Sequence, residues 1–173
     1  MDPAIGRLLG AAARGWGIGS GRVVAAAVSM VLVVLYGAGS GWLVSSGDAW
    51  YRGLDTPSWQ PPDVVFGLIW PYNFVAIAAA GLAVSIHGAG NARVVWLVGL
   101  AGSVAAALTW AWLFYEQHAL WASAVALVVA AVATLPIVAA AFTTRTWAGV
   151  LLVPYQVWLA LAALLSISYA RLN

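Results

Sequence analysis

The sequence predicts an all-α integral membrane protein, a bundle of five transmembrane helices. Of its 173 residues 64% are hydrophobic and only 7% are charged, whereas a soluble domain carries about 25% charged residues. The apolar residues form five runs, each long enough to cross about 30 Å of hydrocarbon, which takes roughly 20 residues. None of these runs contains Asp, Glu, Arg or His. The connections between them are too short to form a soluble domain.

The predicted five-helix transmembrane domain covers residues 23–173 and follows a basic N-terminal extension at 1–22. A signal peptide is the alternative for the first apolar run. That run is longer than a signal core of about 7–15 residues, which favours a retained helix. The expected helices lie at about 23–44, 64–86, 94–115, 119–142 and 147–169.

The arginines predict an orientation in the membrane. Short connections make neighbouring helices antiparallel, so the N-terminus shares one side with the second and fourth connections. Cytoplasmic loops are enriched in Arg and Lys, and the other side carries only Arg52 and Arg171 beside four acidic residues. We therefore expect a cytoplasmic N-terminus and an external C-terminus. The arginines expected on the cytoplasmic side are Arg7, Arg14, Arg22, Arg93 and Arg145.

Composition argues against several classes of function. The few arginines are too sparse for nucleic-acid binding, and without Cys there is no thiolate site. Ion-coupled pumps keep ionisable groups at membrane depth, which these helices lack. His87 and His118 fall on opposite sides of the membrane, and Glu116 with His118 has no nucleophile nearby. We expect no nucleic-acid partner, no metal and no intrinsic cofactor.

Aromatic and small residues recur at helical spacing on three of the expected helices. Spacings of three and four residues place side chains on one stripe of a helix. A packed seam between helices is one interpretation. Three such stripes favour a pocket instead, with rings as walls and small residues as room for a flat, hydrophobic ligand. The stripes are Phe66, Trp70, Asn73 and Ile77; Ser103, Ala107, Trp110 and Phe114; and Tyr155, Trp158, Ala162, Leu165 and Tyr169.

The longest connection, residues 45–63, is rich in Trp and Pro. Pro61 and Pro62 stand at the start of the second helix, where the first N–H groups have no helical partner and Pro is tolerated. They stiffen the entry, so that Trp50 and Trp59 can fold over the bundle. We interpret the connection as a lid over the pocket. The alternative is an interfacial anchor without ligand contact.

The run WYRGLDTPSWQPPDVVFGLIW at 50–70 resembles the first-loop signature of the translocator protein family, also called tryptophan-rich sensory proteins or peripheral-type benzodiazepine receptors. ALTWAWLFY at 107–115 and VPYQVWLALAALLSISYARLN at 153–173 match further on. The likeness covers roughly residues 23–173. It implies a five-helix bundle, usually dimeric, that binds porphyrins such as protoporphyrin IX or another haem-pathway tetrapyrrole, for sensing, sequestration or transfer.

The resemblance also implies site residues. Some bacterial members are reported to degrade protoporphyrin with light and oxygen through two pocket tryptophans, which correspond to Trp70 and Trp158, so a porphyrin photo-oxidising enzyme is an alternative function. A structural or partner-binding membrane module is another. This sequence departs from the family at two Asn positions: the one in the third helix corresponds to Ala107 in an ungapped alignment or Thr109 in a gapped one, and the one in the fifth helix to Ser166. Stripes and resemblance together give the expected ligand-binding set: Phe66, Gly67, Ile69, Trp70, Asn73, Trp110, Phe114, Tyr155, Trp158, Ala162 and Leu165.

Two further expectations concern partners. Leu165, Tyr169 and Arg171 match a proposed cholesterol-contact pattern, which would indicate sterol binding. The alternative is that Tyr and Arg at this helix end anchor it in the membrane lipid, which is their ordinary role. The small residues Gly99, Ser103 and Ala106 form a ridge on the third helix. Such ridges let helices approach closely, and we expect a homodimer through this one.

Overall fold

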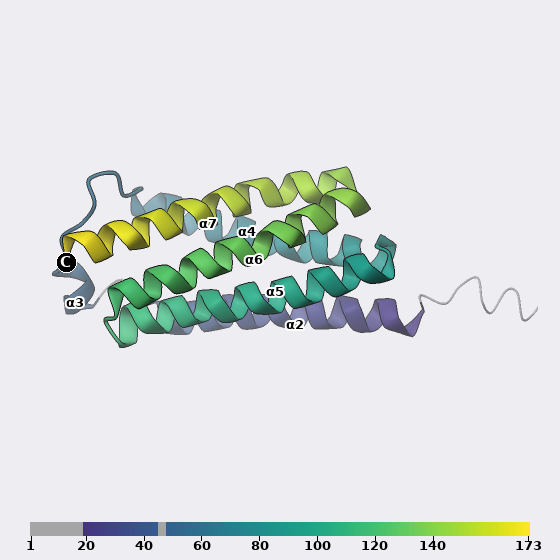
Figure 1. Cartoon of the computed structure of the whole chain (residues 1–173), viewed down its shortest axis with the longest axis horizontal. Helices are drawn as coiled ribbons and strands as arrows, with labels where there is room; N and C mark the ends of the chain where they lie inside the picture. The colour runs from purple at the N-terminus through teal and green to yellow at the C-terminus, as the bar shows by residue number, and fades with distance from the viewer. Residues whose placement is uncertain (1–18, 45–47) are drawn as a thin grey trace, which may run out of the picture.

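The computed structural model describes residues 19–44 and 48–173. Residues 1–18 of the expected N-terminal extension and residues 45–47 of the expected lid lie outside the described residues. Figure 1 shows the described helices as an elongated bundle, with α3 and the following loop at the end that carries the C-terminus. The helices are α2 (Ser20–Leu43), α3 (Ala49–Arg52), α4 (Asp63–His87), α5 (Gly90–Ala111), α6 (Leu120–Thr144) and α7 (Thr146–Leu172), with a π-helical turn, η1 (Trp112–Glu116), directly after α5.

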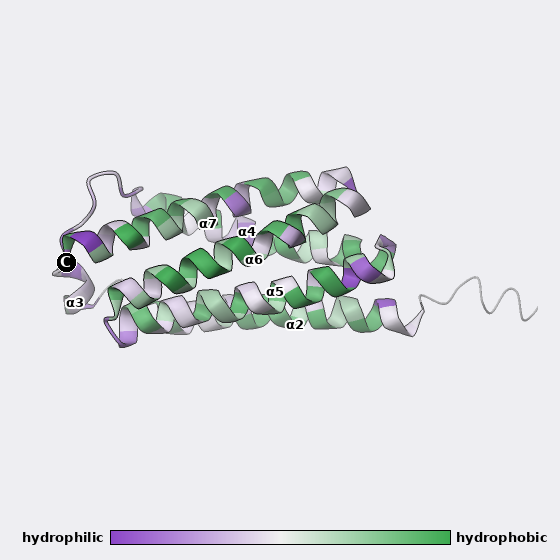
Figure 2. Ribbon diagram, viewed as in Figure 1, coloured by the Kyte–Doolittle hydropathy of each residue, from purple (hydrophilic) through white to green (hydrophobic). Residues whose placement is uncertain are grey.

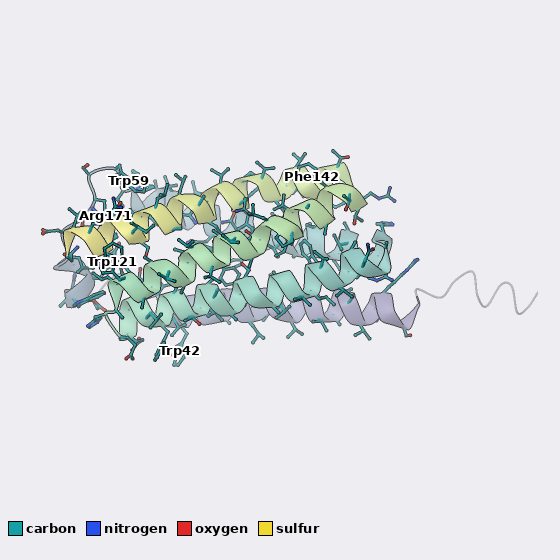
Figure 3. The ribbon with its side chains drawn as sticks, viewed as in Figure 1. Trp42, Trp59, Trp121, Phe142 and Arg171 are labelled. Atoms are coloured by element: carbon teal, nitrogen blue, oxygen red, sulfur yellow. The ribbon has the colours of Figure 1, made fainter. Side chains whose placement is uncertain are left out.

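Five of the helices in the described part of the chain are long and apolar enough to cross a membrane, with η1 extending the third. This confirms the predicted fold class, and the helix ends differ from the expected ones by only a few residues. Figure 2 shows hydrophobic residues along the helices and hydrophilic ones gathered toward both ends of the bundle. Trp42 is 84% exposed and Trp121 57% exposed. Both suit contact with lipid near the membrane surface (Figure 3).

The helices form a closed ring in the order α2, α5, α6, α7 and α4. α6 packs along both α5 and α7, while α2 packs on α4 and α5, and α4 completes the ring by packing on α7. Consecutive spans run in opposite directions, joined by the segment that contains α3 after α2 and by short connections elsewhere. This arrangement leaves the interior of the ring to be filled by side chains from all five spans.

Hydrogen bonds between side chains and neighbouring helices fix the register of the ring. Trp96 Nε1 on α5 donates to Ser29 Oγ on α2 over 3.0 Å. Tyr72 Oη on α4 donates to the Leu151 carbonyl of α7 over 3.0 Å, and Gln156 Nε2 on α7 donates to the Ala131 carbonyl of α6 over 3.0 Å. Since hydrocarbon offers no competing partners, such bonds hold helices at fixed levels.

The structure corrects the expected dimer contact. A Cβ atom built on Gly99 would stand 2.8 Å from Ile137 Cγ1 and 3.3 Å from the Ala133 carbonyl, both on α6. Ser103 is fully buried, and its hydroxyl donates to the Ala130 carbonyl of α6 over 3.3 Å. The small-residue ridge is therefore used within the subunit, to bring α5 close to α6. Ala106, half-buried, packs against the same core.

Replacing Gly99 by Leu should destabilise the subunit, because the larger side chain would overlap Ile137 at the α5–α6 contact. Overpacking of this kind costs about 1–3 kcal/mol, which should lower the thermal unfolding midpoint measured by circular dichroism in detergent. Gly67→Leu is the matched control, because a Cβ atom on the exposed Gly67 meets nothing within 4 Å. A Gly99→Leu protein as stable as this control, with a halved sedimentation mass, would restore the original dimer assignment.

Candidate functional site

A cavity of about 300 Å³ lies between α2, α4, the α5–η1 segment and α7. Its volume is at the lower end of the range for small-molecule sites, which is about 300–1,000 Å³. The lining is mostly aromatic and small. It consists of Tyr36, Gly37, Ser40, Gly41, Val44, Tyr51, Phe66, Trp70, Phe74, Ala107, Trp110, Phe114, Tyr115, Trp158, Ala162, Leu165, Ser166 and Tyr169.

Rings from α2 and α4 form one wall of the cavity. Trp70 and Phe74 are one helical turn apart on α4 and stack, with ring centroids 5.8 Å apart. Tyr36 of α2 packs edge-on against both, at 5.8 Å from Trp70 and 5.4 Å from Phe74. Edge-to-face and stacked pairs of this kind hold each ring in one orientation. The wall therefore presents flat aromatic surface in a defined position.

The opposite wall comes from α7. Trp158 is buried and meets Phe66 of α4 edge-on, with centroids 5.1 Å apart. One turn further along α7, Ala162 leaves room between the rings, and Ser166 Oγ accepts a hydrogen bond of 3.2 Å from Trp110 Nε1. The Trp158 indole N–H is buried without a protein partner. It is thus available to a hydrogen-bond acceptor on a ligand.

The π-helical turn η1 completes the wall formed by the third span. Gln117 N donates to the Trp112 carbonyl, five residues back, over 3.1 Å, which is the wider spacing that defines a π-turn. Phe114 and Tyr115 are adjacent in sequence yet both buried, at 2% and 8% exposure, and both line the cavity. In a regular α-helix neighbouring residues diverge by about 100°. The wider turn lets both rings face inward.

Residues 48–62 cover the end of the bundle beside the cavity, and the C-terminal residue holds them there. Asn173 Oδ1 accepts from the Asp55 backbone N–H over 2.8 Å, and Asn173 Nδ2 donates back to the Asp55 carbonyl over 3.1 Å. A side-chain amide that bonds both the N–H and the carbonyl of one residue forms the same pair of hydrogen bonds as a neighbouring residue in an antiparallel β-sheet. This pair ties the middle of the loop to the end of α7.

Hydrogen bonds of Tyr169 and ring contacts of Trp50 hold the rest of this segment. Tyr169 Oη donates to Gln60 Oε1 and lies 3.3 Å from Tyr51 Oη. Burial raises the pKa of the Tyr51 phenol above its ordinary value, and the hydrogen bond with Tyr169 adds to this shift, so the hydroxyl stays neutral at physiological pH. Trp50 stacks on His118 with centroids 3.9 Å apart and packs against Phe114. The segment is thus anchored at both of its ends.

The sequence-predicted residues divide into three groups in the structure. Gly67 is exposed and Ile69 half-buried, and neither lines the cavity. Asn73 and Tyr155 also do not line it, because they are buried deeper in the bundle, at 0% and 2% exposure. The remaining expected residues are brought together at the cavity wall. They are Phe66, Trp70, Trp110, Phe114, Trp158, Ala162 and Leu165.

The predicted lid residues lie close to the cavity but do not line it. Trp59 and Pro61 line a crevice of about 10 Å³ with Phe66 and Trp158, which also belong to the main cavity. Pro62 occupies the position just before α4. Trp50 is separated from the cavity by Phe114. The lining residue contributed by this segment is Tyr51.

Sequence reasoning missed the contribution of the first span. Tyr36, Gly37, Ser40 and Gly41 of α2 all line the cavity. A Cβ atom on Gly37 would touch the Phe74 ring at 3.8 Å, so this glycine lies close to the rings of α4. Tyr36 stands directly before a run of small residues at 37–41. An aromatic ring beside small residues, as in the other three stripes, was the available signal.

The two histidines lie at opposite ends of the bundle. His87 lies 3.5 Å from Arg145 at one end and His118 stacks on Trp50 at the other. No group of three or more His, Asp and Glu side chains in the described residues could hold a metal ion. Tyr169 is 3% exposed and faces the covering segment. The three residues of the sterol pattern, Leu165, Tyr169 and Arg171, therefore do not all face the lipid.

The chain resembles proteins of one membrane family over most of its length. A profile of the TspO/MBR family matches residues 28–172. The tryptophan-rich sensory protein of Cereibacter sphaeroides is 35% identical over 130 residues, 73% of this chain and 78% of that protein. The translocator protein of Homo sapiens is 34% identical over 146 residues, 78% and 81% of the two chains. Protein CrtK of Rhodobacter capsulatus is 30% identical over 141 residues, 79% and 86% of the two chains.

The extent of these matches agrees with the architecture. The matched residues run from the first span to the end of the fifth and include the whole cavity. Five apolar helices make this chain an integral, multi-pass membrane protein. It belongs to the TspO/MBR family.

Proposed function

We propose that this protein is a membrane receptor that binds a porphyrin or related flat tetrapyrrole for sensing, sequestration or transfer. The observation that carries the proposal is a cavity within the membrane-spanning bundle whose walls are oriented rings from different helices, separated by the small residues Ala107 and Ala162. A flat hydrophobic ring gains there by leaving water and by stacking. The relatives' names, sensory protein and translocator protein, agree with a receptor or carrier role.

The α2 side of the cavity suits a ligand larger than the cavity itself. Gly41 and Val44 line the cavity and are exposed, and a Cβ atom on Gly41 would meet nothing within 4 Å. A macrocycle seated between Trp70 and Trp158 would extend past the small α2 residues toward the lipid. The aqueous end of the cavity is covered by the anchored residues 48–62. We infer that the ligand enters from the membrane and that this segment acts as a lid.

Charge placement supports a definite ligand orientation. Each cavity-lining residue in the described part of the chain is uncharged. Arg52 and Arg171 stand at the end covered by the lid, both exposed. Because carboxylates are costly to bury in hydrocarbon without a partner, the propionates of a porphyrin would point to this end. Arg93 and Arg145 lie toward the opposite end, which we propose faces the cytoplasm together with the N-terminus.

Removing both central tryptophans should abolish tight porphyrin binding. Each ring contributes about 0.5–1.5 kcal/mol of stacking beyond area burial, so Trp70→Leu with Trp158→Leu should weaken protoporphyrin IX binding at least about tenfold, measured by titration of the porphyrin Soret absorbance. Trp42→Leu with Trp121→Leu is the matched control, since both side chains are exposed. Equal affinity of the two double variants would show that the ligand binds elsewhere.

The same samples address photo-oxidation as a second function, because both tryptophans implied by the family resemblance line the cavity. If the protein is a photo-oxidising enzyme, porphyrin bound to the wild-type protein should bleach faster under light and oxygen than free porphyrin does. The Trp70 and Trp158 double variant would lose that excess. Equal bleaching of free and bound porphyrin would remove photo-oxidation from consideration.

Releasing the C-terminal amide should loosen the lid. Asn173→Ala removes both contacts to Asp55, so amide hydrogen exchange over residues 53–60 should become several-fold faster and porphyrin dissociation faster with it. Leu172→Ala, at an exposed neighbouring residue, should change neither. Unaltered exchange in Asn173→Ala would mean that the lid is held mainly by Tyr169 and the Trp50–His118 stack.

We propose a homodimer that pairs through the outward face of α5 rather than through Gly99. Ala101, Gly102 and Ala105 are exposed there, and a Cβ atom on Gly102 meets nothing within 4 Å. Small residues on a lipid-facing surface permit close helix approach. Gly102→Leu should therefore give a monomeric sedimentation mass in detergent with the fold intact. A mass equal to that of the wild-type protein would move the interface to another helix.

A further inference from the structure

A group of buried polar side chains adjoins the aromatic wall of the cavity. Asn73 of α4, Tyr36 of α2 and Tyr155 of α7 are 0%, 1% and 2% exposed; we call these three residues the polar floor. The Tyr36 ring packs edge-on against Trp70 and Phe74, and all three of these rings line the cavity. The polar floor therefore adjoins the deep end of the cavity through Tyr36.

The helix register brings Asn73 and Tyr155 to neighbouring levels of the bundle. The contacts of Phe66 with Trp158 and of Tyr72 with Leu151 set α4 antiparallel to α7, which puts Asn73 and Tyr155 about one turn apart. Helical side chains lean toward the N-terminus of their own helix. On antiparallel helices, Asn73 and Tyr155 therefore lean toward each other.

The first and third spans meet this level too. Tyr36 contacts Phe74, the residue after Asn73, and the Tyr155 hydroxyl lies near the hydroxyls of Tyr36 and Ser103. Asn73 is ten residues into α4, or about 15 Å from its start at 1.5 Å per residue. That depth is close to the middle of about 30 Å of hydrocarbon.

The polar floor has unused hydrogen-bonding capacity. Among the described residues, both amide atoms of Asn73 are buried without a hydrogen-bond partner, and the hydroxyls of Tyr36 and Tyr155, although close to each other, form no well-aligned hydrogen bond. An unpaired polar group in hydrocarbon costs several kcal/mol. Together these groups offer the Asn73 carbonyl as an acceptor, its two N–H donors, and two hydroxyls that can act as either. An occupant that both donates and accepts would satisfy them.

We propose that the polar floor is a binding subsite for one uncharged group that both donates and accepts hydrogen bonds. An ordered water molecule has this chemistry, and so does a hydroxyl group on the edge of the cavity's ligand. A charged group is disfavoured, because the residues of the floor are neutral and the site lies at mid-membrane depth. The ligand-hydroxyl form rests on the proposed porphyrin-binding function, whereas the water form does not.

Two porphyrins that differ only in two side groups provide the test. Haematoporphyrin carries hydroxyethyl groups where protoporphyrin IX carries vinyl groups, and both keep the same carboxylates. We expect wild-type protein to bind haematoporphyrin at least as tightly as protoporphyrin IX in Soret titrations. Asn73→Leu should lower the affinity for haematoporphyrin relative to protoporphyrin IX about tenfold. Tyr155→Phe, which keeps the ring, should shift the affinity ratio in the same direction. Agreement between the two variants would show that the shift does not come from a folding defect in Asn73→Leu.

The control variant is Ser85→Ala. Ser85 Oγ is also buried without a partner on α4 but lies about three turns from Asn73, so its removal should leave the affinity ratio unchanged. A nuclear Overhauser contact between water and the Asn73 side-chain amide in ligand-free protein tests the water form. Such a contact with an unchanged affinity ratio in Asn73→Leu would support the subsite and identify water as its occupant.

The proposal is overturned if the affinity ratio is the same in wild type, Asn73→Leu and Tyr155→Phe and no water contact appears at Asn73. Failure of the proposed function has a different signature. In that case neither porphyrin binds the wild-type protein, and the water contact alone decides whether the polar floor holds an uncharged occupant.

Discussion

The structure depends on the lack of hydrogen-bonding solvent inside a membrane. Hydrocarbon leaves backbone groups no partners outside their own helix, so the spans are helical along their whole length. The few polar side chains at this depth then decide how the helices lie against one another. Trp96 with Ser29, Tyr72 with Leu151 and Gln156 with Ala131 each join two helices. These bonds fix the positions of the helices relative to one another along the membrane normal. They therefore determine which aromatic side chains meet around the cavity.

The cavity occurs where close packing of the helices is relaxed. Along α5 and α6, Gly99 and Ser103 let the helices pack tightly, and this region is filled. Between α4 and α7 the facing residues are large rings, Phe66 and Trp158, which keep the helices apart. Pro71 and Pro154 lie near the same level of these two helices, and a proline in a helix interior removes one backbone hydrogen bond and bends the helix. Small residues in one half and rings in the other thus divide the bundle into a packed region and a binding region.

Much of the fold and part of the site could be predicted from the sequence. Apolar length identified the five spans, and 3.6-residue periodicity brought Trp70, Trp110 and Trp158 to one place. Periodicity could not show that Gly99 faces α6 rather than a second subunit, since small residues serve both contacts. It also assumed a regular helix, and so missed that η1 turns Tyr115 inward beside Phe114. Asn73 satisfied the spacing rule for a cavity residue, yet it is fully buried in the bundle and does not line the cavity.

The central claim is that the rings of this cavity hold a flat tetrapyrrole in one orientation. Protoporphyrin IX is achiral and gives no circular dichroism in its Soret band unless a chiral site fixes it. The account predicts that titration into the purified protein produces an induced Soret signal that saturates at one porphyrin per subunit and disappears on thermal unfolding. Porphyrin that associates with the protein without an induced Soret signal, or without saturation at a defined ratio, would contradict the account.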